Sequence, residues 1–264
     1  MKIAERVGTR LVRWGVAAGM VVCATAVIGA TERNGSAMVR FAFGQPQVSR
    51  GSGAAVTAER YMVLRPGDVI KTDAKSHLDM VLGNNNGSAQ VTPGSELALE
   101  KLTYSNNGLE VVHDTQLSLR SGAVAGNVNK MAAASKYEIK TPKGVVGIRG
   151  TRYKISANGD VAVTDGRAVM ALTMPDGSVK TFTVDQGNML AAATGQIRPL
   201  SRTETREINE LINDSMTHGG YLNSADPNTR KFFDEAQQEP WVPPVTEVEE
   251  PPVSPFAPIR PRPF

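Results

Sequence analysis

The side chains that most often perform chemistry in proteins are few in this sequence and far apart. Its 264 residues contain three histidines, His77, His113 and His218, and one cysteine, Cys23. No two histidines form an H-x-x-x-H pair, and no cluster of carboxylates has the spacing of metal ligands. We therefore expect no metal and no cofactor. Cys23 lies in the apolar N-terminal run, so the rest of the chain has no thiol for a disulfide or a nucleophile.

The motifs of nucleophilic and phosphate chemistry are also missing. No G-x-S-x-G sequence surrounds a serine. The spacing of Gly144, Gly147 and Gly150 resembles that of a phosphate-binding loop, but no G-K-[ST] follows. The next residues favour a strand, whereas a phosphate-binding loop is followed by a helix. The pair His113-Asp114 stands beside a turn, where we expect a solvated loop. We predict no catalytic residue; the alternative is an enzyme whose groups converge from distant positions.

The strongest structural signal lies between residues 136 and 166. Two runs of alternating polar and apolar residues surround the three glycines, and Asn158-Gly159 and Asp165-Gly166 supply hairpin turns. The first run ends at Pro142, which cannot donate to a strand ladder. We interpret this segment as the crossing point of an all-β domain, where a glycine-spaced apolar connection lets backbones approach closely.

Five residues of this crossing are our candidates for a structural role or a partner contact: Gly144, Gly147, Arg149, Gly150 and Thr151. We expect Arg149 to be partly buried and to donate hydrogen bonds to backbone carbonyls. The alternative is that Arg149 recognises a carboxylate on a ligand or partner. We expect Gly147 and Gly150 to require a positive φ or close backbone contact.

The rest of the chain predicts an antiparallel β-sandwich or roll of many short strands, with residues 31–45 as a short leader into this domain. Between Tyr61 and Ala193, alternating runs are separated by turn signals at the spacing of all-β folds. A helical extension is expected over residues 201–238. Its first helix begins with a Ser201–Glu204 capping box and ends at Gly219-Gly220, and its second begins at Asp226-Pro227. Residues 239–264 are rich in proline and are expected to form a disordered tail that serves as a spacer or a docking segment.

Charge and hydropathy at the N-terminus predict export. The basic residues Lys2, Arg6, Arg10 and Arg13, set against Glu5, account for the net charge of +3, so the remainder is neutral and a nucleic-acid partner is not expected. An uncharged run follows at residues 14–30. Residues 1–30 therefore predict a cleaved signal peptide or an uncleaved anchor in the inner membrane, and either places the rest of the chain in the periplasm or cell envelope.

Several stretches resemble the FecR-like domain of bacterial envelope regulators. The main one is KTPKGVVGIRGTRYKI, in which T-P precedes an apolar G-x-x-G-x-R-G-T. In chain order the others are LRPGDVIKT, SHLDMVLGNNNGSAQVTPGSELALEKL, LSLRSGAVAGNV, VAVTDGRAVMAL and FTVDQGNMLAA. The resemblance covers roughly residues 44–195 and implies the fold and the compartment of that family.

In the best-known members of the family, this domain is the periplasmic part of a transmembrane regulator that relays the state of an outer-membrane transporter to a cytoplasmic sigma factor. Only about thirteen residues precede Trp14 here. We therefore expect the fold and compartment to carry over, but not sigma-factor binding.

The function that we predict is a non-catalytic β module of the envelope. It would bind an envelope protein or a cell-surface polymer outside the cytoplasm. The alternatives are a membrane-anchored sensor or regulator in transmembrane signalling and, less favoured, an enzyme that acts on cell-wall polymers. Each alternative needs a feature of its own: an uncleaved anchor for the sensor, and a deep pocket with converging carboxylates for the enzyme.

Overall fold

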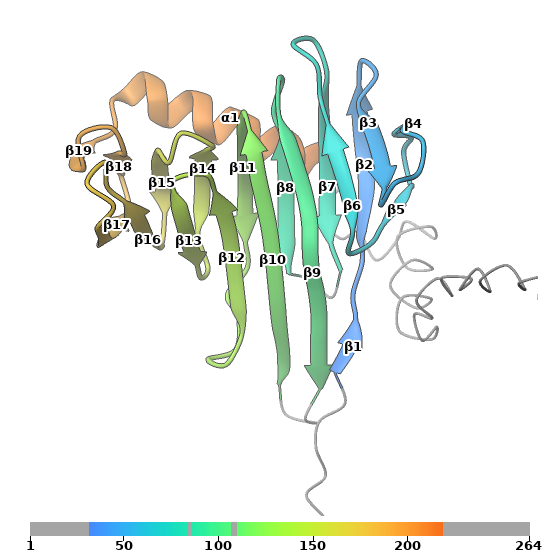
Figure 1. Ribbon diagram of the computed structural model, residues 1–264, viewed down its shortest axis with the longest axis horizontal. Coiled ribbons are helices and arrows are strands. Elements are labelled where there is room, and N and C mark those ends of the chain that lie inside the picture. The colour runs from blue at the N-terminus through green and yellow to red at the C-terminus, as the bar shows by residue number, and fades with distance from the viewer. Residues whose placement is uncertain (1–31, 84–85, 107–109, 219–264) are drawn as a thin grey trace, which may run out of the picture.

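The structure, a computed structural model, describes residues 32–83, 86–106 and 110–218 (Figure 1). The predicted signal or anchor segment (1–30), the second helix of the extension and the proline-rich tail (239–264) lie outside the described residues. In the described part, nineteen strands and one helix follow one another along the chain. The predicted all-β fold of many short strands followed by helical structure is confirmed.

The strands form two sheets. Sheet A has the order β17-β16-β13-β12-β10-β9-β6-β3-β4, with β1 paired to β9, and sheet B has the order β19-β18-β15-β14-β11-β8-β7-β2-β5. The strands of sheet A are β1 (Glu32–Asn34), β3 (Gln47–Arg50), β4 (Val56–Thr57), β6 (Asp68–Lys71), β9 (Glu96–Asn106), β10 (Val111–Ser121), β12 (Lys136–Thr141), β13 (Gly144–Ile148), β16 (Arg167–Thr173) and β17 (Val179–Asp185). Those of sheet B are β2 (Ala37–Phe43), β5 (Val63–Leu64), β7 (His77–Leu82), β8 (Gly87–Val91), β11 (Ala123–Val128), β14 (Arg152–Ser156), β15 (Val161–Asp165), β18 (Asn188–Ala191) and β19 (Gln196–Pro199).

The chain passes repeatedly from one sheet to the other, and most neighbouring strands are antiparallel. The exception is β12, which pairs with β10 in parallel. After β10 the chain crosses to sheet B as β11 and returns to sheet A as β12, so both strands run in the same direction. A parallel pair requires such a crossover, because a tight hairpin can join only antiparallel strands.

The core lies between the sheets and follows from the period-two alternation of the strands. In β10, for example, Thr115, Leu117 and Leu119 are buried, whereas Gln116 and Ser118 are partly exposed. Side chains that alternate in this way place one face of each sheet against the other. At one point the core is polar: the hydroxyls of Tyr137 on β12 and Tyr153 on β14 meet across it.

The helix α1 (Arg202–His218) packs on the outer face of sheet B, behind the sheets as seen in Figure 1. Ile208 and Ile212 pack there against Ala125 and Ala162, whose small side chains leave room for the helix. The predicted capping box is present at its start: the Ser201 N–H donates to Glu204, and the Glu204 N–H donates to the Ser201 hydroxyl.

Two sequence interpretations of the β region need correction. Residues 31–45 were expected to form a short leader into the domain, but Ala37–Phe43 forms β2, which pairs with β7 inside sheet B. The glycine-spaced segment after Pro142 was expected to be a connection, but Gly144–Ile148 forms β13, a strand between β12 and β16. The crossing between sheets follows β13, at Arg149 and Gly150. The sheets also extend on both sides of the predicted domain limits, 44–195.

Candidate functional site

Gly144 and Gly150 are required by the backbone at the crossing. Gly144 has a φ of +148°, and a Cβ atom there would lie 2.0 Å from the carbonyl oxygen of Ala171 on the neighbouring strand β16. Gly150 has a φ of +62° and turns the chain from sheet A into sheet B. Residues with a Cβ atom avoid such a conformation, so the fold requires glycine at both positions.

Thr151 ties three strands together at the same place. Its backbone exchanges two hydrogen bonds with Val128 at the end of β11. Its hydroxyl donates to the carbonyl of Arg167 at the start of β16, at 2.7 Å, and the side chain is buried. Thr151 therefore holds the crossing together, because its hydroxyl satisfies a carbonyl of the opposite sheet.

Gly147 has no such structural requirement. It lies in the middle of β13 and is absent from the residues with positive φ. A Cβ atom there would meet only the carbonyl oxygen of Val169, at 3.9 Å. The expectation of a positive φ or close backbone contact is therefore wrong for Gly147.

Arg149 also differs from the expectation. Its side chain is exposed, whereas the sequence favoured a partly buried guanidinium bonded to carbonyls. Among the described residues, no hydrogen bond or ion pair of this guanidinium is found. Thr151 donates to the Arg149 carbonyl at 3.2 Å, so only the backbone of Arg149 takes part in the crossing. The side chain is left available to a carboxylate outside the domain.

Gly147 lies on the outer face of sheet A, in the middle of β13. The register places Gly147 between Glu138 on β12 and Val169 on β16, and Val169 lies opposite Thr183 on β17. The next row along these strands contains Val145, Ala171 and Thr181. We call the uncharged part of this surface the sheet A patch; its residues are Val145, Gly147, Val169, Ala171, Thr181 and Thr183.

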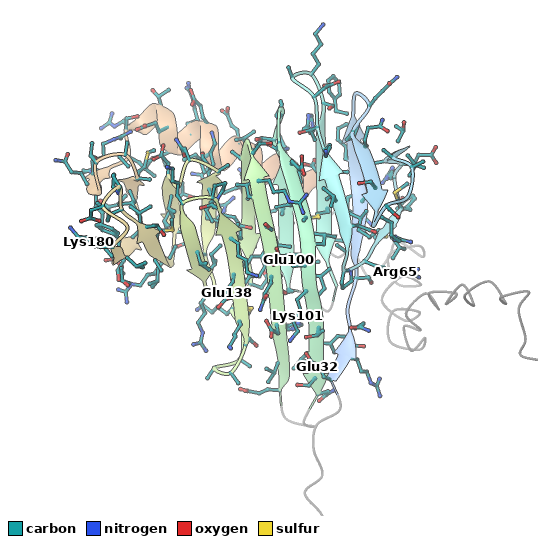
Figure 2. All side chains as sticks on the ribbon, viewed as in Figure 1. Glu32, Arg65, Glu100, Lys101, Glu138 and Lys180 are labelled. Carbon is teal, nitrogen blue, oxygen red and sulfur yellow. The ribbon has the colours of Figure 1, made fainter. Side chains whose placement is uncertain are left out.

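The charged residues of sheet A lie mainly on the other half of the same face. Lys101 contacts both Asp114, at 2.7 Å, and Glu32, at 3.0 Å. Lys140 contacts Glu100 at 2.6 Å. Figure 2 shows Glu100, Lys101 and Glu138 over β9 and β12. The hydrogen bonds that Lys101 donates to Asp114 and Glu32 raise the pKa of Lys101. The pairs thus form a charged border beside the uncharged patch.

Sequence reasoning named only Gly147 among the patch residues, and Val169 is the most informative of those that it missed. It is 41 % exposed although it is a large apolar side chain in a strand. Its neighbours Ala168 and Met170 are buried, so the alternation along β16 directs Val169 outward. The run RAVMALT shows the alternation of a strand. However, apolar residues occupy both sets of alternating positions, so the sequence did not show which face is exposed.

The two histidines whose side chains the structure describes, His77 and His113, do not converge. His113 lies inside β10, where burial lowers its pKa, and His77 lies on β7 in the other sheet. His113 and Asp114 are not a solvated loop pair as expected: His113 is buried, while Asp114 points outward to Lys101. Successive strand residues face opposite sides, so these two side chains cannot act as a dyad.

Two searches of the described residues bear on other kinds of site. Within residues 32–83, 86–106 and 110–218, no group of three or more His, Cys, Asp or Glu side chains could hold a metal ion. In the same ranges, no helix has both the length and the apolar character needed to cross a bilayer.

Comparison with known proteins finds a family model that resembles the central region. Residues 68–169 match the family model described as FecR protein. No curated protein matches the chain. Two crystal structures described as candidate anti-sigma factors from Parabacteroides distasonis ATCC 8503 are similar to it, each at 12% sequence identity, with TM-scores of 0.38 and 0.39.

The structural matches are partial on both sides. They cover 50% and 54% of this chain and 59% and 64% of those proteins. The family match covers the strands from β6 into β16 and includes all five candidate residues of the crossing. Residues 68–169 are therefore similar to the FecR family model.

Proposed function

We propose that the chain is a non-catalytic regulatory module of the bacterial envelope that binds another protein through the sheet A patch. The similarity to the FecR family model supports a regulatory role. The geometry supports binding, since the two outer faces differ: α1 covers part of sheet B, but no described helix packs on sheet A.

Gly147 is the observation that carries this proposal. Glycine inside a strand weakens it by roughly 0.5–1 kcal/mol relative to alanine. The fold does not require glycine here, because φ is not positive and a Cβ atom would be free of close contact. Glycine in a strand commonly marks a place where a ligand or another backbone approaches closely. The exposed Val169 beside it supplies apolar surface for such a contact.

The chemistry of the patch favours a protein over a polysaccharide or an anionic polymer. Its side chains are small or β-branched and uncharged. It contains no aromatic ring on which a sugar could stack and no cluster of cations for phosphate groups. Arg149, exposed at the end of β13, adds one cation that can pair with a carboxylate of the partner.

The location follows from the leader segment. The basic residues before Trp14 and the uncharged run up to Ala30 favour export to the periplasm. If the leader is retained, the module is held at the inner membrane and fits the sensor alternative. N-terminal sequencing of the mature protein distinguishes the two forms, because cleavage would give a start near residues 25–32.

The test is a capture experiment from envelope extract with the full chain as bait. The variants Gly147→Trp and Val169→Asp should lose the captured protein while the melting temperature stays within a few degrees of the wild type. Val56→Trp is the matched control, since Val56 is also exposed but lies at the opposite edge of sheet A. Arg149→Ala should weaken capture without changing stability. If Gly147→Trp, Val169→Asp and Arg149→Ala capture as much protein as the wild type and the Val56→Trp control do, the proposal is refuted.

A further inference from the structure

The strands at the ends of the two sheets are not protected equally. Sheet A ends at β17 and β4, and sheet B ends at β19 and β5. Both β4 and β5 have two residues, and β19 has four residues and ends at Pro199. Short strands and proline hinder the pairing of a further strand at an edge. In contrast, β17 has seven residues, Val179–Asp185, and none of them is proline. Among the described end strands, β17 is therefore the one best suited to pair with another strand.

The backbone groups that β17 presents at the edge follow from the hairpin before it. The Met174 N–H donates to the Ser178 carbonyl at 2.8 Å, so these residues form a hydrogen-bonded pair. Hydrogen-bonded and non-hydrogen-bonded pairs alternate along an antiparallel ladder. In the register of β16 and β17, the non-hydrogen-bonded positions are then those of Val179, Thr181 and Thr183. Their N–H and C=O groups point away from β16, toward an edge where no other described strand pairs.

Sheet B continues further than sheet A at this end of the molecule. Strand β17 lies across from β15 and β18, and β19 lies one strand beyond β18 (Figure 1). Ile197 on β19 is paired with Leu190, which is completely buried in the core, so both side chains point to the inner side of sheet B. Ile197 is nevertheless 43 % exposed. A strand added beside β17 would lie over Ile197 and remove it from water.

We propose that β17 accepts an extended strand from a partner protein, paired antiparallel to it. Main-chain hydrogen bonds to the outward groups of Thr181 and Thr183 would supply affinity, and the alternate side chains of the added strand would supply specificity. The inference deepens the proposed function and rests on it for the class of partner, a protein. Both threonines belong to the sheet A patch, so the added strand would extend that surface.

The side chains around this position define the sequence that fits. On the inner side, Phe182 is partly exposed and Val184 is buried, and Ile197 lies on the facing sheet. Apolar residues at alternate positions of the added strand would pack against them. Lys180 is on the same side of β17 and is exposed at the end of the molecule (Figure 2). An acidic residue opposite Lys180 would form a cross-strand ion pair. On the outer side, threonine suits the threonines of β17.

A second copy of this chain does not fit the same position. Two copies that paired through β17 would be related by a two-fold axis perpendicular to sheet A. In each copy, β19 extends beyond β17 on the side of the new pair. The projecting parts of the two B sheets would therefore occupy the same space. A single extended segment has no second sheet and avoids this clash.

The test uses the synthetic peptide Thr-Val-Thr-Ile-Thr-Glu-Thr, labelled with fluorescein, as the probe. In the antiparallel register its glutamate lies opposite Lys180, and its threonine N–H groups point at β17. Fluorescence polarisation with the full chain should show saturable binding. The peptide that is N-methylated at its threonines should bind at least tenfold more weakly. The peptide that is N-methylated at Val, Ile and Glu is the matched control and should bind like the parent, because those N–H groups point to solvent.

Variants of the protein test the position of the site. Thr183→Pro removes an outward N–H and leaves the ladder to β16 intact, so peptide binding should weaken at least tenfold while the melting temperature stays within a few degrees. Ile197→Asp should also weaken binding. Val56→Asp is the control, because Val56 is exposed on β4 at the other end of sheet A.

A separate variant distinguishes this proposal from binding at the sheet A patch. Gly147 lies on β13, with β16 between it and β17. Gly147→Trp should therefore leave peptide binding unchanged even where it abolishes capture of the envelope protein. If the peptide binds but Gly147→Trp captures as much protein as the wild type, the proposed function fails and the strand site at β17 stands.

Hydrogen exchange measured residue by residue gives an independent readout. In the free protein, the amides of Thr181 and Thr183 should exchange rapidly and that of Phe182 slowly, because only Phe182 donates to β16. The peptide should slow the exchange of both threonine amides at least tenfold. The proposal is overturned by any of three results: no binding of the parent peptide, equal binding of the two methylated peptides, or unchanged exchange of Thr181 and Thr183.

Discussion

The hydroxyls of Tyr137 and Tyr153 lie 3.2 Å apart in the interior, and this hydrogen bond joins sheet A to sheet B. Both side chains are almost completely buried, and their rings meet edge to face at a centroid distance of 6.4 Å. A buried hydroxyl must find a partner, and here each is the partner of the other. Gly126 makes room for the pair, because a Cβ atom there would lie 2.8 Å from the Tyr153 hydroxyl.

The two single substitutions in this pair should together cost more stability than the double substitution. Tyr137→Phe or Tyr153→Phe leaves the other hydroxyl buried without its partner, so each should destabilise the protein by about 1–3 kcal/mol. The double variant removes both polar groups and should lose less than the two single losses combined. Urea denaturation of the four proteins measures this coupling; strictly additive losses would show that the hydroxyls do not interact.

The same pair predicts a loss of stability at alkaline pH. Burial raises the pKa of both hydroxyls well above the ordinary value near 10. Above about pH 10 the unfolded chain releases these protons while the folded protein retains them, so unfolding becomes more favourable as pH rises. The stabilising effect is complete below pH 10 and is lost above it. Denaturation at pH 8, 10 and 11 should show a steeper loss for the wild type than for Tyr137→Phe/Tyr153→Phe.

The glycines of β13 should respond oppositely to the same substitution. Gly144→Val would place a Cβ atom against the Ala171 carbonyl at a positive φ, so it should lose about 3 kcal/mol or fail to yield soluble protein. Gly147→Val should keep or raise stability by about 0.5–1 kcal/mol, because valine favours a strand and the position is open. Thermal melting compares them, and a strongly destabilised Gly147→Val would refute the assignment of Gly147 to the surface.

Thr151→Val tests the hydroxyl that holds the crossing. Valine keeps the shape but cannot donate to the Arg167 carbonyl, so we expect a loss of about 1–3 kcal/mol. Thr151→Ser keeps the hydroxyl and serves as the control, with a smaller loss from the missing methyl group. If both variants melt alike, packing and not the hydrogen bond stabilises the crossing.

The attachment of α1 should weaken in acid. The hydrogen bonds from Arg198, and then those of Ser201, lower the pKa of Glu204 from 4.5 to about 2. A carboxyl with a lowered pKa stabilises the folded state fully above its ordinary pKa, and this contribution is lost as pH falls from about 4.5 to 2. The midpoint of urea denaturation, followed by the circular dichroism of the helix, should drop over this range in the wild type. Glu204→Gln should show a smaller drop, with lower stability at pH 7.

Local patterns were the parts of the structure that the sequence predicted best. The Ser201–Glu204 capping box at the start of α1 depends on residues three positions apart. The hairpin turn at Gly159 and the strand alternation from Tyr137 to Thr141 are equally local. Such features can be inferred from a single stretch of residues, because their hydrogen bonds close within it.

The errors came from contacts between distant segments. Ala37–Phe43 precedes the turn-rich region and was interpreted as a leader, yet pairing with β7 makes it a strand. Arg149 was expected to be partly buried, since Ile148 and Gly150 flank it in sequence. Its exposure depends on where the sheet crossing directs the side chain, which the neighbouring residues do not specify.

By itself, the sequence determined a thiol-free region of many short strands, its turns, the start of its helix and its resemblance to the FecR family, because these depend on residue type and near-neighbour spacing. Only the tertiary structure decided which glycines serve the fold and which lies open on a sheet face. It also placed β12 parallel to β10 and brought Tyr137 to Tyr153. The physical reason is that burial and strand pairing are properties of segments that meet only after folding, so no single segment contains them.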